Sequence, residues 1–456
     1  MCGIVGAYHA DWFDVGAAVR RLAHRGPDGS GVVEHLGVIH GHTRLAIFDT
    51  TAASAQPFLY RDGCLSYNGE LWNFRQLRAD LEQFGHTFST TGDTEVVAAS
   101  LVEWGAAAID KFDGMFCFAW SSPRERILVR DRFGKLPLYY VTAFNGICWA
   151  SERGGLGNLA GLADALRPGH LLDLASGVAR CYYEIPFIAD ATPDGVEAFL
   201  VRGVEKRLQS DVPVCVLLSG GIDSSLTTAI AAKLRPDVVA YTCYVNDDSL
   251  DLVAAREVAA YLKIEHRIVR VSAPDDAAIR TAIRIVEVPN RTAIETTTLC
   301  VQLAAAVRAD GFKVAISGEA SDELFGGYGT LARRATSDTA WRTARMQFFA
   351  KMGRSDFHRV NKSFMRHGVE VRMPFCERDL VETVMSLGRK ACPPNKKLLI
   401  GIAERWIPRK IARRQKLTFH GGAGVIAHCE TRAKTGGRDA YYNQILREIF
   451  GRIVRG

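Results

Sequence analysis

The feature that most constrains the fold is an uninterrupted apolar run followed by a glycine-rich loop. Residues 212–218 (VPVCVLL) are typical of a parallel strand that is buried on both faces. The loop at 219–224 (SGGIDS) follows directly and leads into a helical pattern. Glycines let a backbone close around an anion, and Ser219 and Ser224 add hydroxyls beside the helix N-terminus. The segment predicts a phosphate-binding turn, and because it lacks G-K-[ST] it is not a Walker A loop.

The second half of the chain continues this alternation of strands and helices. Further strands are predicted at Val238–Val245, Ile268–Val271 and Lys313–Ser317, with a helix at about Leu252–Leu262 and mostly helical sequence towards the C-terminus. Such alternation is typical of an α/β fold with a doubly wound parallel sheet. We assign it to a domain of residues 191–456.

The first half has a different pattern and predicts an α+β domain of residues 1–190, built from stacked antiparallel sheets. Its short alternating strands are separated by Gly-rich turns. The clearest strands are at 31–33, 39–42, 64–67, 115–120 and 126–130. One helix is predicted from about Thr94 to Gly105, with Asp93 as its N-cap. A turn at 192–195 (TPDG) separates the two halves.

Composition limits the class of protein. With 456 residues, 48% hydrophobic and 23% charged, the chain is typical of a globular protein with two domains. No apolar run approaches the ~20 residues that cross a membrane, and the N-terminus lacks the pattern of a signal peptide. Eleven cysteines without a C-x-x-C pair argue against zinc and against a disulfide framework. We therefore expect a cytoplasmic protein that does not bind a membrane.

Charge is distributed unevenly along the chain. The first 186 residues carry 16 basic and 20 acidic side chains, so the net charge of +7 comes from the remainder, much of it after Leu387. A basic region suits a polyanion such as ATP, pyrophosphate or a nucleic acid. It is more often the pattern of a solvated helix face, so charge alone does not identify a partner.

A second polar cluster follows the strand predicted at 313–317. The sequence 317–323 (SGEASDE) should reach the same carboxyl edge of the sheet as the loop at 219–224. Asp223 and Asp322 could then share a magnesium ion that binds the phosphates of ATP, with Glu319 over the reacting carbonyl. Each acid alone could be a helix cap, but their occurrence on two loops of one edge favours the metal site.

The N-terminus (MCGIVGAY) places a cysteine directly after the start methionine. Cys2 could be a small apolar residue that opens a buried strand. Alternatively, removal of Met1 would leave a thiol and a free α-amino group on one residue, which is a nucleophile with its own base.

Together these motifs resemble the glutamine-dependent asparagine synthetases. Further matches are 368–375 (GVEVRMPF) to G-x-E-x-R-x-P-F, 414–416 (RQK) to R-Q-K, and 249–252 (SLDL) to S-P-D-L. The resemblance implies an Ntn-hydrolase-like class II glutamine amidotransferase domain followed by an ATP-pyrophosphatase synthetase domain. It also implies that Lys416 stabilises charge on the adenylate and on pyrophosphate. The nucleotide site that it implies consists of Leu217, Ser219, Gly220, Gly221, Asp223, Ser224, Val245, Ser317 and Gly318.

The same resemblance assigns glutamine hydrolysis to the first half. Cys2 would attack the side-chain amide of glutamine, and Asn68 with Gly69 would form the oxyanion hole. Arg44 would pair with the α-carboxylate, and Asp93 would bind the α-amino group. The implied glutamine-binding residues are Arg44, Leu45, Asn68, Glu70 and Asp93. The alternatives are ordinary structure, because Asn-Gly is a common hairpin turn and Asp93 is a good N-cap.

One departure from the family concerns the acceptor. Synthetases that make asparagine carry a segment resembling T-T-I-R-A-S-T, whereas this chain has 292–298 (TAIETTT), so that Glu295 replaces an arginine. If that arginine holds a carboxylate of aspartate, the replacement inverts the charge of the site, and an unpaired buried carboxylate there is costly. Alternatively, Glu295 points elsewhere or pairs with Arg291, and the acceptor is still aspartate. Glu295 and Glu319 are therefore the candidate acceptor-binding residues.

The favoured function is the ATP-driven amidation of a carboxylate through an acyl-adenylate, with nitrogen from glutamine and with Mg²⁺. The most economical acceptor is aspartate, and the alternative is another acid, such as a specialised metabolite or a nucleotide-like acceptor. No nucleic acid is required, and a homodimer is compatible with the resemblance. A lactam-forming relative is disfavoured because its tyrosine-based dyad is not found. Intact Cys2, Asp223, Asp322 and Lys416 disfavour a catalytically silent binding protein.

Overall fold

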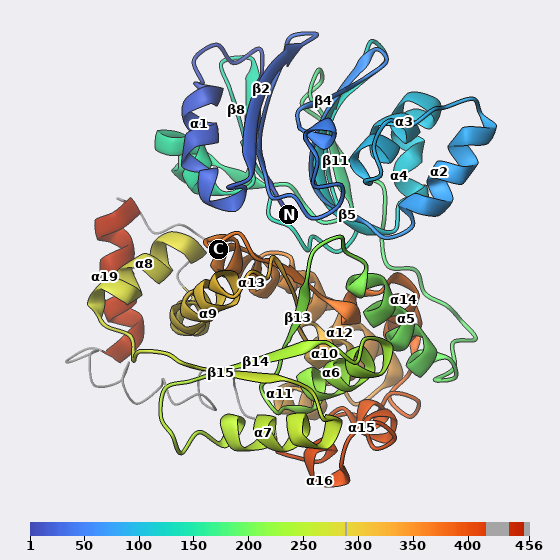
Figure 1. Cartoon of the computed structure of the whole chain (residues 1–456), viewed down its shortest axis with the longest axis vertical. Helices are drawn as coiled ribbons and strands as arrows, with labels where there is room; N and C mark the ends of the chain where they lie inside the picture. Colours follow the sequence, from blue (N-terminus) through green and yellow to red (C-terminus); the bar gives the residue numbers. More distant parts are fainter. Residues whose placement is uncertain (288–289, 416–436, 451–456) are drawn as a thin grey trace. The chain divides into compact units, whose positions relative to one another are not determined.

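The computed structural model describes residues 1–287, 290–415 and 437–450 (Figure 1). Contacts divide the chain into two units. The first consists of residues 1–184 with 365–368, and the second of residues 185–364 with 369–456.

The first unit contains two six-stranded antiparallel sheets that face one another. The first sheet has the order β10 (Asp164–Ala165), β8 (Tyr139–Ala143), β9 (Gly146–Ala150), β1 (Gly3–Tyr8), β3 (Val38–Arg44) and β2 (Gly29–His35). The second has the order β12 (Ala179–Cys181), β11 (His170–Asp173), β7 (Arg126–Arg130), β6 (Gly114–Ser121), β5 (Gly63–Leu71) and β4 (Phe58–Tyr60). The α+β fold with stacked antiparallel sheets is thus confirmed.

Helices cover the outer faces of this sandwich, α1 on one side and α2, α3 and α4 on the other (Figure 1). Their bounds are α1 Val15–Arg21, α2 Phe74–Gln83, α3 Thr94–Trp104 and α4 Ala108–Lys111, with 3₁₀ segments at Ala23–Arg25, Ala52–Ser54, Gly105–Ala107 and Arg153–Leu162.

Alternation along β3 determines which side chains enter the space between the sheets. Gly41 faces α1, where a Cβ would lie 2.8 Å from both Val15 and Val19. The neighbouring positions His40 and His42 point the other way, and their imidazoles contact β6 and β5. From His40 to Arg44 the inner face of β3 is therefore polar.

The second unit is an α/β structure around a five-stranded parallel sheet. Its strands have the order β15 (His266–Arg270), β14 (Val239–Tyr244), β13 (Val214–Leu217), β16 (Val314–Ile316) and β17 (Glu370–Arg372). All four neighbouring pairs are parallel, which confirms the predicted doubly wound sheet. Strand order reverses between β13 and β16, and such a switch point opens a crevice at the carboxyl ends of the strands.

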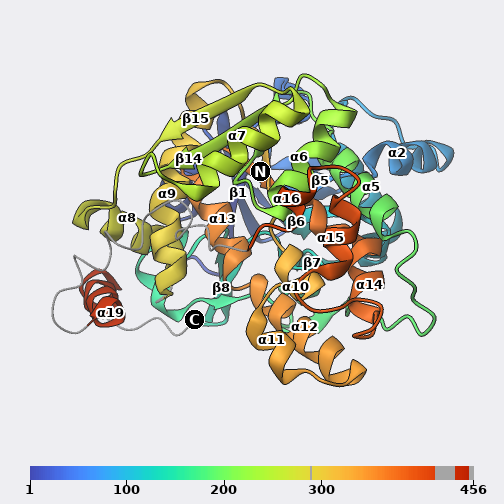
Figure 2. The same cartoon turned by 90° about the horizontal axis from the view of Figure 1, so that it is seen from below.

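Helices lie on both faces of this sheet, with α6 and α7 on one side and α9 and α13 on the other (Figures 1 and 2). The helices around the sheet are α5 Val196–Leu208, α6 Ile222–Leu234, α7 Leu250–Leu262, α8 Asp276–Val286 and α9 Arg291–Ala309. Those that follow β16 are α10 Ser321–Phe325, α11 Gly329–Arg334, α12 Asp338–Met352, α13 Asp356–Met365, the 3₁₀ segment Pro374–Cys376, α14 Arg378–Ser386, α15 Lys397–Ala403, α16 Arg409–Ala412 and α19 Gly437–Phe450.

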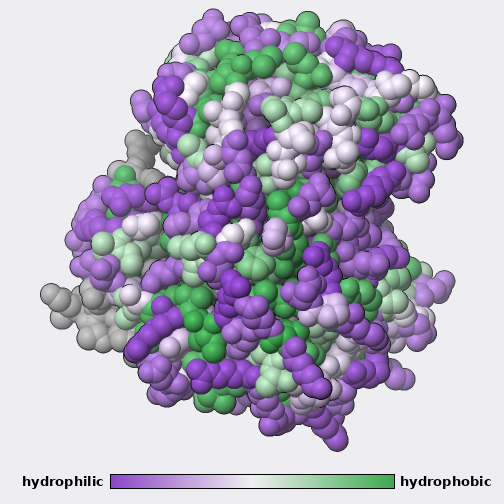
Figure 3. Space-filling view, in the orientation of Figure 1, coloured by the Kyte–Doolittle hydropathy of each residue, from purple (hydrophilic) through white to green (hydrophobic). Residues whose placement is uncertain are grey.

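The surface shows a mixture of residue types. On the face in Figure 3, hydrophilic residues predominate and hydrophobic ones form small groups between them. Within the described ranges, none of the helices has both the length and the apolar character that crossing a bilayer requires.

Candidate active site

Cys2 directly precedes β1, and contacts with other residues fix its position. Its backbone N–H donates to Asn68 Oδ1 at 2.8 Å, and its carbonyl accepts from Arg25 Nε at 3.0 Å. The N–H of Leu45 points at the thiol, with 3.4 Å between nitrogen and Sγ. Cys2 is only 7% exposed. The thiol therefore has a defined position at the end of the sandwich, next to Leu45 and Asn68.

Asn68 and Gly69 lie inside β5, where they pair with Cys117 and Phe116 of β6. The sequence predicted a strand only at 64–67, with a hairpin turn at Asn68-Gly69 as the alternative, but β5 continues through both residues to Leu71. The side-chain orientation of Asn68 follows from its contact with Cys2, because the atom that faces a backbone N–H must be the oxygen. Its Nδ2 is buried and has no hydrogen-bond partner among the described residues. A donor is thus left available beside the thiol.

Two charged residues complete this cluster. Arg44 donates to the backbone carbonyls of Thr51, at 2.6 Å, and Asp49. Asp93 precedes α3, as predicted, but its side chain does not cap the helix. Instead its carboxylate accepts from the Tyr67 hydroxyl at 3.0 Å and from the backbone of β5.

The structure brings most of the predicted glutamine-binding residues to one small cavity, which we call the Cys2 site. Its lining includes Cys2, Arg44, Leu45, Gly69, Glu70 and Asp93. Asn68 joins the site through its hydrogen bond to Cys2. The site combines a thiol, an unused N–H donor, a guanidinium and carboxylates, and this set suits the binding and cleavage of an amino-acid amide.

A second cavity, of about 740 Å³, lies at the carboxyl ends of β13 and β16, and we call it the sheet-edge cavity. Its volume is in the usual range for ligand sites. Gly318 allows the two loops to approach, because a Cβ there would lie 2.9 Å from Asp223 Cβ. Of the residues predicted from the sequence, those that line it are Leu217, Ser219, Gly221, Asp223, Ser224, Ser317, Gly318, Glu319 and Asp322.

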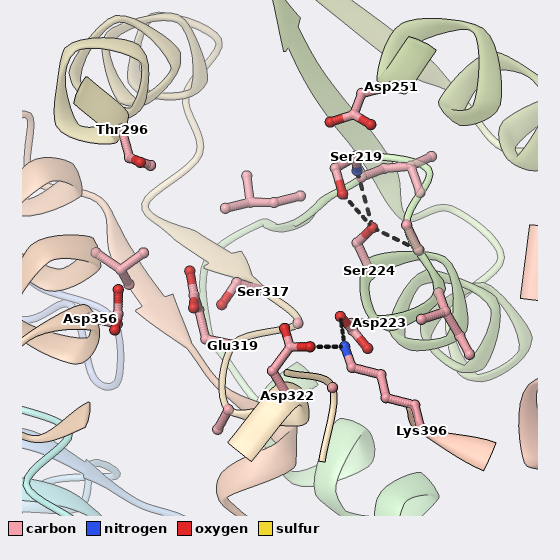
Figure 4. Close-up of a pocket in the computed structure, with 18 of the residues that line it drawn as sticks. Ser219, Asp223, Ser224, Asp251, Thr296, Ser317, Glu319, Asp322, Asp356 and Lys396 are labelled. Atoms are coloured by element: carbon pink, nitrogen blue, oxygen red, sulfur yellow. Dashed lines mark hydrogen bonds and ion pairs between the residues drawn. The ribbon is translucent and has the colours of Figure 1, made fainter. Parts of the chain in front are cut away.

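Asp223 and Asp322 converge on one point of this cavity (Figure 4). Lys396 Nζ lies 2.6 Å from a carboxylate oxygen of Asp223 and 2.7 Å from one of Asp322. Burial disfavours the charge of Lys396, but the two carboxylates outweigh this effect and raise the pKa of its ammonium group. Sequence reasoning did not identify Lys396, which directly precedes α15.

Glu319 is paired within the cavity. It accepts from Arg359 Nη2 at 2.8 Å, and Arg359 belongs to α13 and also lines the cavity. Burial raises the pKa of the Glu319 carboxyl, and the nearby guanidinium opposes that shift. A tyrosine–glutamate pair is also present, because the Tyr328 hydroxyl donates to Glu323 at 2.5 Å and both residues line the cavity. Neither Arg359 nor this pair was predicted.

Gly220 and Val245 do not line the sheet-edge cavity. Gly220 has φ +71°, and a Cβ there would lie 2.6 Å from the backbone of Ala255, so this glycine forms the turn and allows close packing on α7. Val245 is buried directly after β14. Lys416 lies outside the described residues.

Glu295 is also absent from the cavity lining. Thr292, Thr296 and Cys300 of α9 line the cavity, whereas Glu295 turns towards α19 and accepts from the Tyr442 hydroxyl at 3.1 Å. In this structure Glu295 therefore points away from the cavity, as in the alternative reading of the sequence, because the residue occupies a different face of the helix. Among the described contacts, Arg291 lies 3.7 Å from Asp439.

Comparison with known proteins bears on both sites. The model of a glutamine amidotransferase domain matches residues 1–178, and that of asparagine synthase matches 195–357 and 333–435. The chain is 33% identical over 442 residues to asparagine synthetase [glutamine-hydrolyzing] 3 of Arabidopsis thaliana, covering 89% of this chain and 75% of the relative. The chain belongs to the glutamine-hydrolysing asparagine synthetase family.

Other family members are similarly related. The asparagine synthetase [glutamine-hydrolyzing] of Sandersonia aurantiaca is 33% identical over 442 residues, covering 89% of this chain and 82% of the relative. That of Zea mays is 32% identical over 439 residues, covering 89% of this chain and 74% of the relative.

The loop after β16 contains a residue with a strained backbone. Ala320 has a φ of +78°, which is in the left-handed region. An L side chain there costs roughly 1–2 kcal/mol. The backbone of the second loop therefore requires the conformation that glycine adopts freely, and this chain adopts it with an alanine.

Proposed function

We propose that this chain makes asparagine from aspartate, with ATP as the activating substrate and glutamine as the nitrogen donor. The observation that carries the proposal is that a chain of this family contains both half-sites. An unused amide donor lies beside the Cys2 thiol, and two aspartates converge at the switch point of a parallel sheet. We assign the glutaminase to residues 1–190 and the synthetase to residues 191–456.

In the first half-reaction, Cys2 Sγ attacks the side-chain carbonyl of glutamine. Loss of Met1 frees the α-amino group, which takes the thiol proton and returns it to the departing ammonia. The negative charge that develops on the carbonyl oxygen is stabilised by Asn68 Nδ2 and by the N–H of Gly69. Water then hydrolyses the thioester, which releases glutamate and restores the thiol.

The remaining residues of the Cys2 site orient glutamine. The Arg44 guanidinium pairs with the α-carboxylate, and the Asp93 carboxylate binds the α-amino group. Glu70 and the backbone of Leu45 complete the contacts. These roles follow from charge complementarity and from the shared lining of one cavity.

In the second half-reaction, ATP occupies the sheet-edge cavity with its phosphates at the loop of Ser219–Ser224. Asp223 and Asp322 would hold Mg²⁺, which uses one or two carboxylates together with substrate phosphates. The convergence of both carboxylates on one cation, Lys396 Nζ, supports this proposal, because it brings two oxygen ligands together. Mg²⁺ would neutralise charge on the phosphates.

The cationic and acidic side chains of the cavity have different roles toward ATP and the acceptor acid. Lys396 supplies positive charge at the point where the two carboxylates meet, and Lys416 is assigned to the adenylate and the leaving pyrophosphate. Glu319, held by Arg359, is assigned to the carbonyl that ammonia attacks. Because Glu295 is outside the lining, its carboxylate gives no argument for an acceptor other than aspartate.

The cysteines that the structure describes are all free. That state suits a reducing cytoplasm, which is the location we propose. A homodimer remains compatible with the family resemblance, and it is tested by measuring the mass of the chain in solution.

The proposal is tested by pyrophosphate release with ATP, Mg²⁺, ammonium and a panel of acids. Aspartate should give release, and chromatography should identify asparagine in equal amount. Glutamate and other dicarboxylates should give little release. Release with another acid and none with aspartate would contradict the proposed acceptor.

Replacing Asn68 by aspartate tests the oxyanion hole. This near-isosteric change keeps an oxygen for the Cys2 N–H but removes the Nδ2 donor. We expect the kcat for glutamine hydrolysis to fall by about 10²- to 10³-fold, as when one oxyanion donor is lost. Synthesis from ammonium should be unchanged. An unchanged glutaminase kcat would exclude this role for Nδ2.

Replacing Glu295 by glutamine tests its position outside the cavity. The amide oxygen can still accept from the Tyr442 hydroxyl, so the fold should be retained. We expect the KM for aspartate and the selectivity among acids to be unchanged in the pyrophosphate assay. A marked gain in aspartate use would show that the carboxylate of Glu295 acts on the acceptor after all.

A further inference from the structure

One buried histidine joins the two sheets of the first unit beside the Cys2 site. His42 is on β3, two residues before Arg44, and it is fully buried. Its Nε2 lies 3.1 Å from the backbone oxygen of Tyr67, the residue that precedes Asn68 on β5. A carbonyl only accepts, so Nε2 carries the hydrogen and donates it. This contact connects the strand that carries Arg44 to the strand that carries Asn68.

The contact occurs on the edge of β5 that faces away from β6, where no strand continues β4. The ladder between β4 and β5 ends at the pair Phe58–Leu65. Beyond it, the N–H of Tyr67 donates to Gln56 Oε1 at 2.7 Å, and its carbonyl accepts from His42. A buried backbone carbonyl needs such a partner. On this side, opposite β6, His42 and Gln56 therefore take the place of a strand partner immediately before the oxyanion-hole asparagine.

The imidazole is oriented and neutral. Burial lowers the pKa of His42 to about 3, so the ring carries one hydrogen at neutral pH. The other nitrogen, Nδ1, is buried without a hydrogen-bond partner among the described residues. The bond to Tyr67 is therefore the hydrogen bond that the structure shows for this ring.

We propose that His42 is a positioning residue for glutamine hydrolysis, which fixes Asn68 relative to Cys2 by holding the carbonyl of Tyr67. This inference rests on the proposed glutaminase function. It predicts a specific kinetic effect. Without the bond from His42, β5 shifts and Nδ2 of Asn68 moves away from the developing oxyanion. Glutamine binding is retained, because Arg44 is held separately by the carbonyls of Thr51 and Asp49.

The test compares two amide substitutions that differ in reach. In His42→Gln the side-chain NH₂ can occupy the place of Nε2, whereas in His42→Asn it reaches only the place of Nδ1. The control is His40→Asn, which changes an equally buried histidine on the same strand face. His40 bonds to Ser121 of β6 at 2.8 Å and not to β5. Glutamate release gives kcat and KM, and thermal unfolding reports stability.

We expect His42→Asn to lower the kcat for glutamine by about 10- to 100-fold, the scale of a small misplacement of catalytic groups. The KM should be unchanged, His42→Gln should recover most of the kcat, and His40→Asn should lose stability but keep its kcat. Equal loss of kcat in His42→Asn and His40→Asn would overturn the proposal. A loss in His42→Gln as large as that in His42→Asn would also overturn it. If His42→Asn does not fold, a kcat of His42→Gln far below that of the wild type overturns it. Failure of the wild type to release glutamate would instead refute the proposed function.

Discussion

Replacing Cys2 by alanine should abolish synthesis from glutamine and leave synthesis from ammonium intact. The substitution removes the nucleophile, so the glutamine-dependent rate should fall by ~10⁴-fold or more, as when a covalent mechanism loses its nucleophile. Cys2 does not line the sheet-edge cavity, so amidation there should still proceed with added ammonia. Pyrophosphate release measured with each nitrogen source separates the two rates.

A second cysteine provides the matched control for this experiment. Cys64 is on β5 and fully buried, and burial raises the pKa of its thiol to about 12. Cys64→Ala should therefore lower stability without changing the preference for glutamine. Equal loss of the glutamine and ammonium reactions in Cys2→Ala would contradict a scheme with two separate sites.

Replacing Asp322 by asparagine should abolish synthesis from either nitrogen source and leave glutamine hydrolysis intact. The amide keeps the shape of the side chain but removes the charge that would hold Mg²⁺. We expect pyrophosphate release to fall by more than about 100-fold with either nitrogen source. Loss of a residue that only hydrogen-bonds to a metal ligand typically lowers activity by ~10- to 100-fold, and loss of a ligand itself should cost more. Glutamine hydrolysis at Cys2 should persist. Release of glutamate without pyrophosphate is the expected signature.

The control for Asp322 is an acid of the same unit that does not line the cavity. Asp379 is half-exposed and pairs with Arg202. Asp379→Asn should leave pyrophosphate release unchanged. If Asp322→Asn retains release at the level of Asp379→Asn, the two converging aspartates do not form the metal site.

The architecture was predictable where the sequence has a clear apolar strand pattern. The apolar run at 212–218 contains β13, and the stretch at 126–130 coincides with β7. Because β13 and β16 are neighbouring parallel strands, their following loops had to meet at one sheet edge. The convergence of Asp223 and Asp322 follows from that topology.

The position of Asn68 was less predictable, because Asn-Gly is most familiar as a turn. In β5 the pair lies within a strand, and Gly69 is required by close approach, since a Cβ there would lie 2.3 Å from the backbone oxygen of Met115. Sequence periodicity does not show such an approach between strands. The same limit applies to His42, whose contact joins two sheets.

Lys396 and Glu295 show what sequence patterns could not resolve in the second unit. Lys396 lies 74 positions after Asp322, and its approach to both aspartates depends on how α15 packs. The matching of Glu295 to an arginine in the family identified the position but not the helix face. Its contact with Tyr442 of α19 depends on a helix more than a hundred residues away.

Transfer of labelled nitrogen is the most direct test of the whole account. The chain is incubated with glutamine labelled with ¹⁵N at the side-chain amide, together with aspartate, ATP and Mg²⁺. We predict asparagine labelled at its side-chain amide, with pyrophosphate and glutamate formed in parallel. Labelled ammonia without labelled asparagine or pyrophosphate would contradict the account.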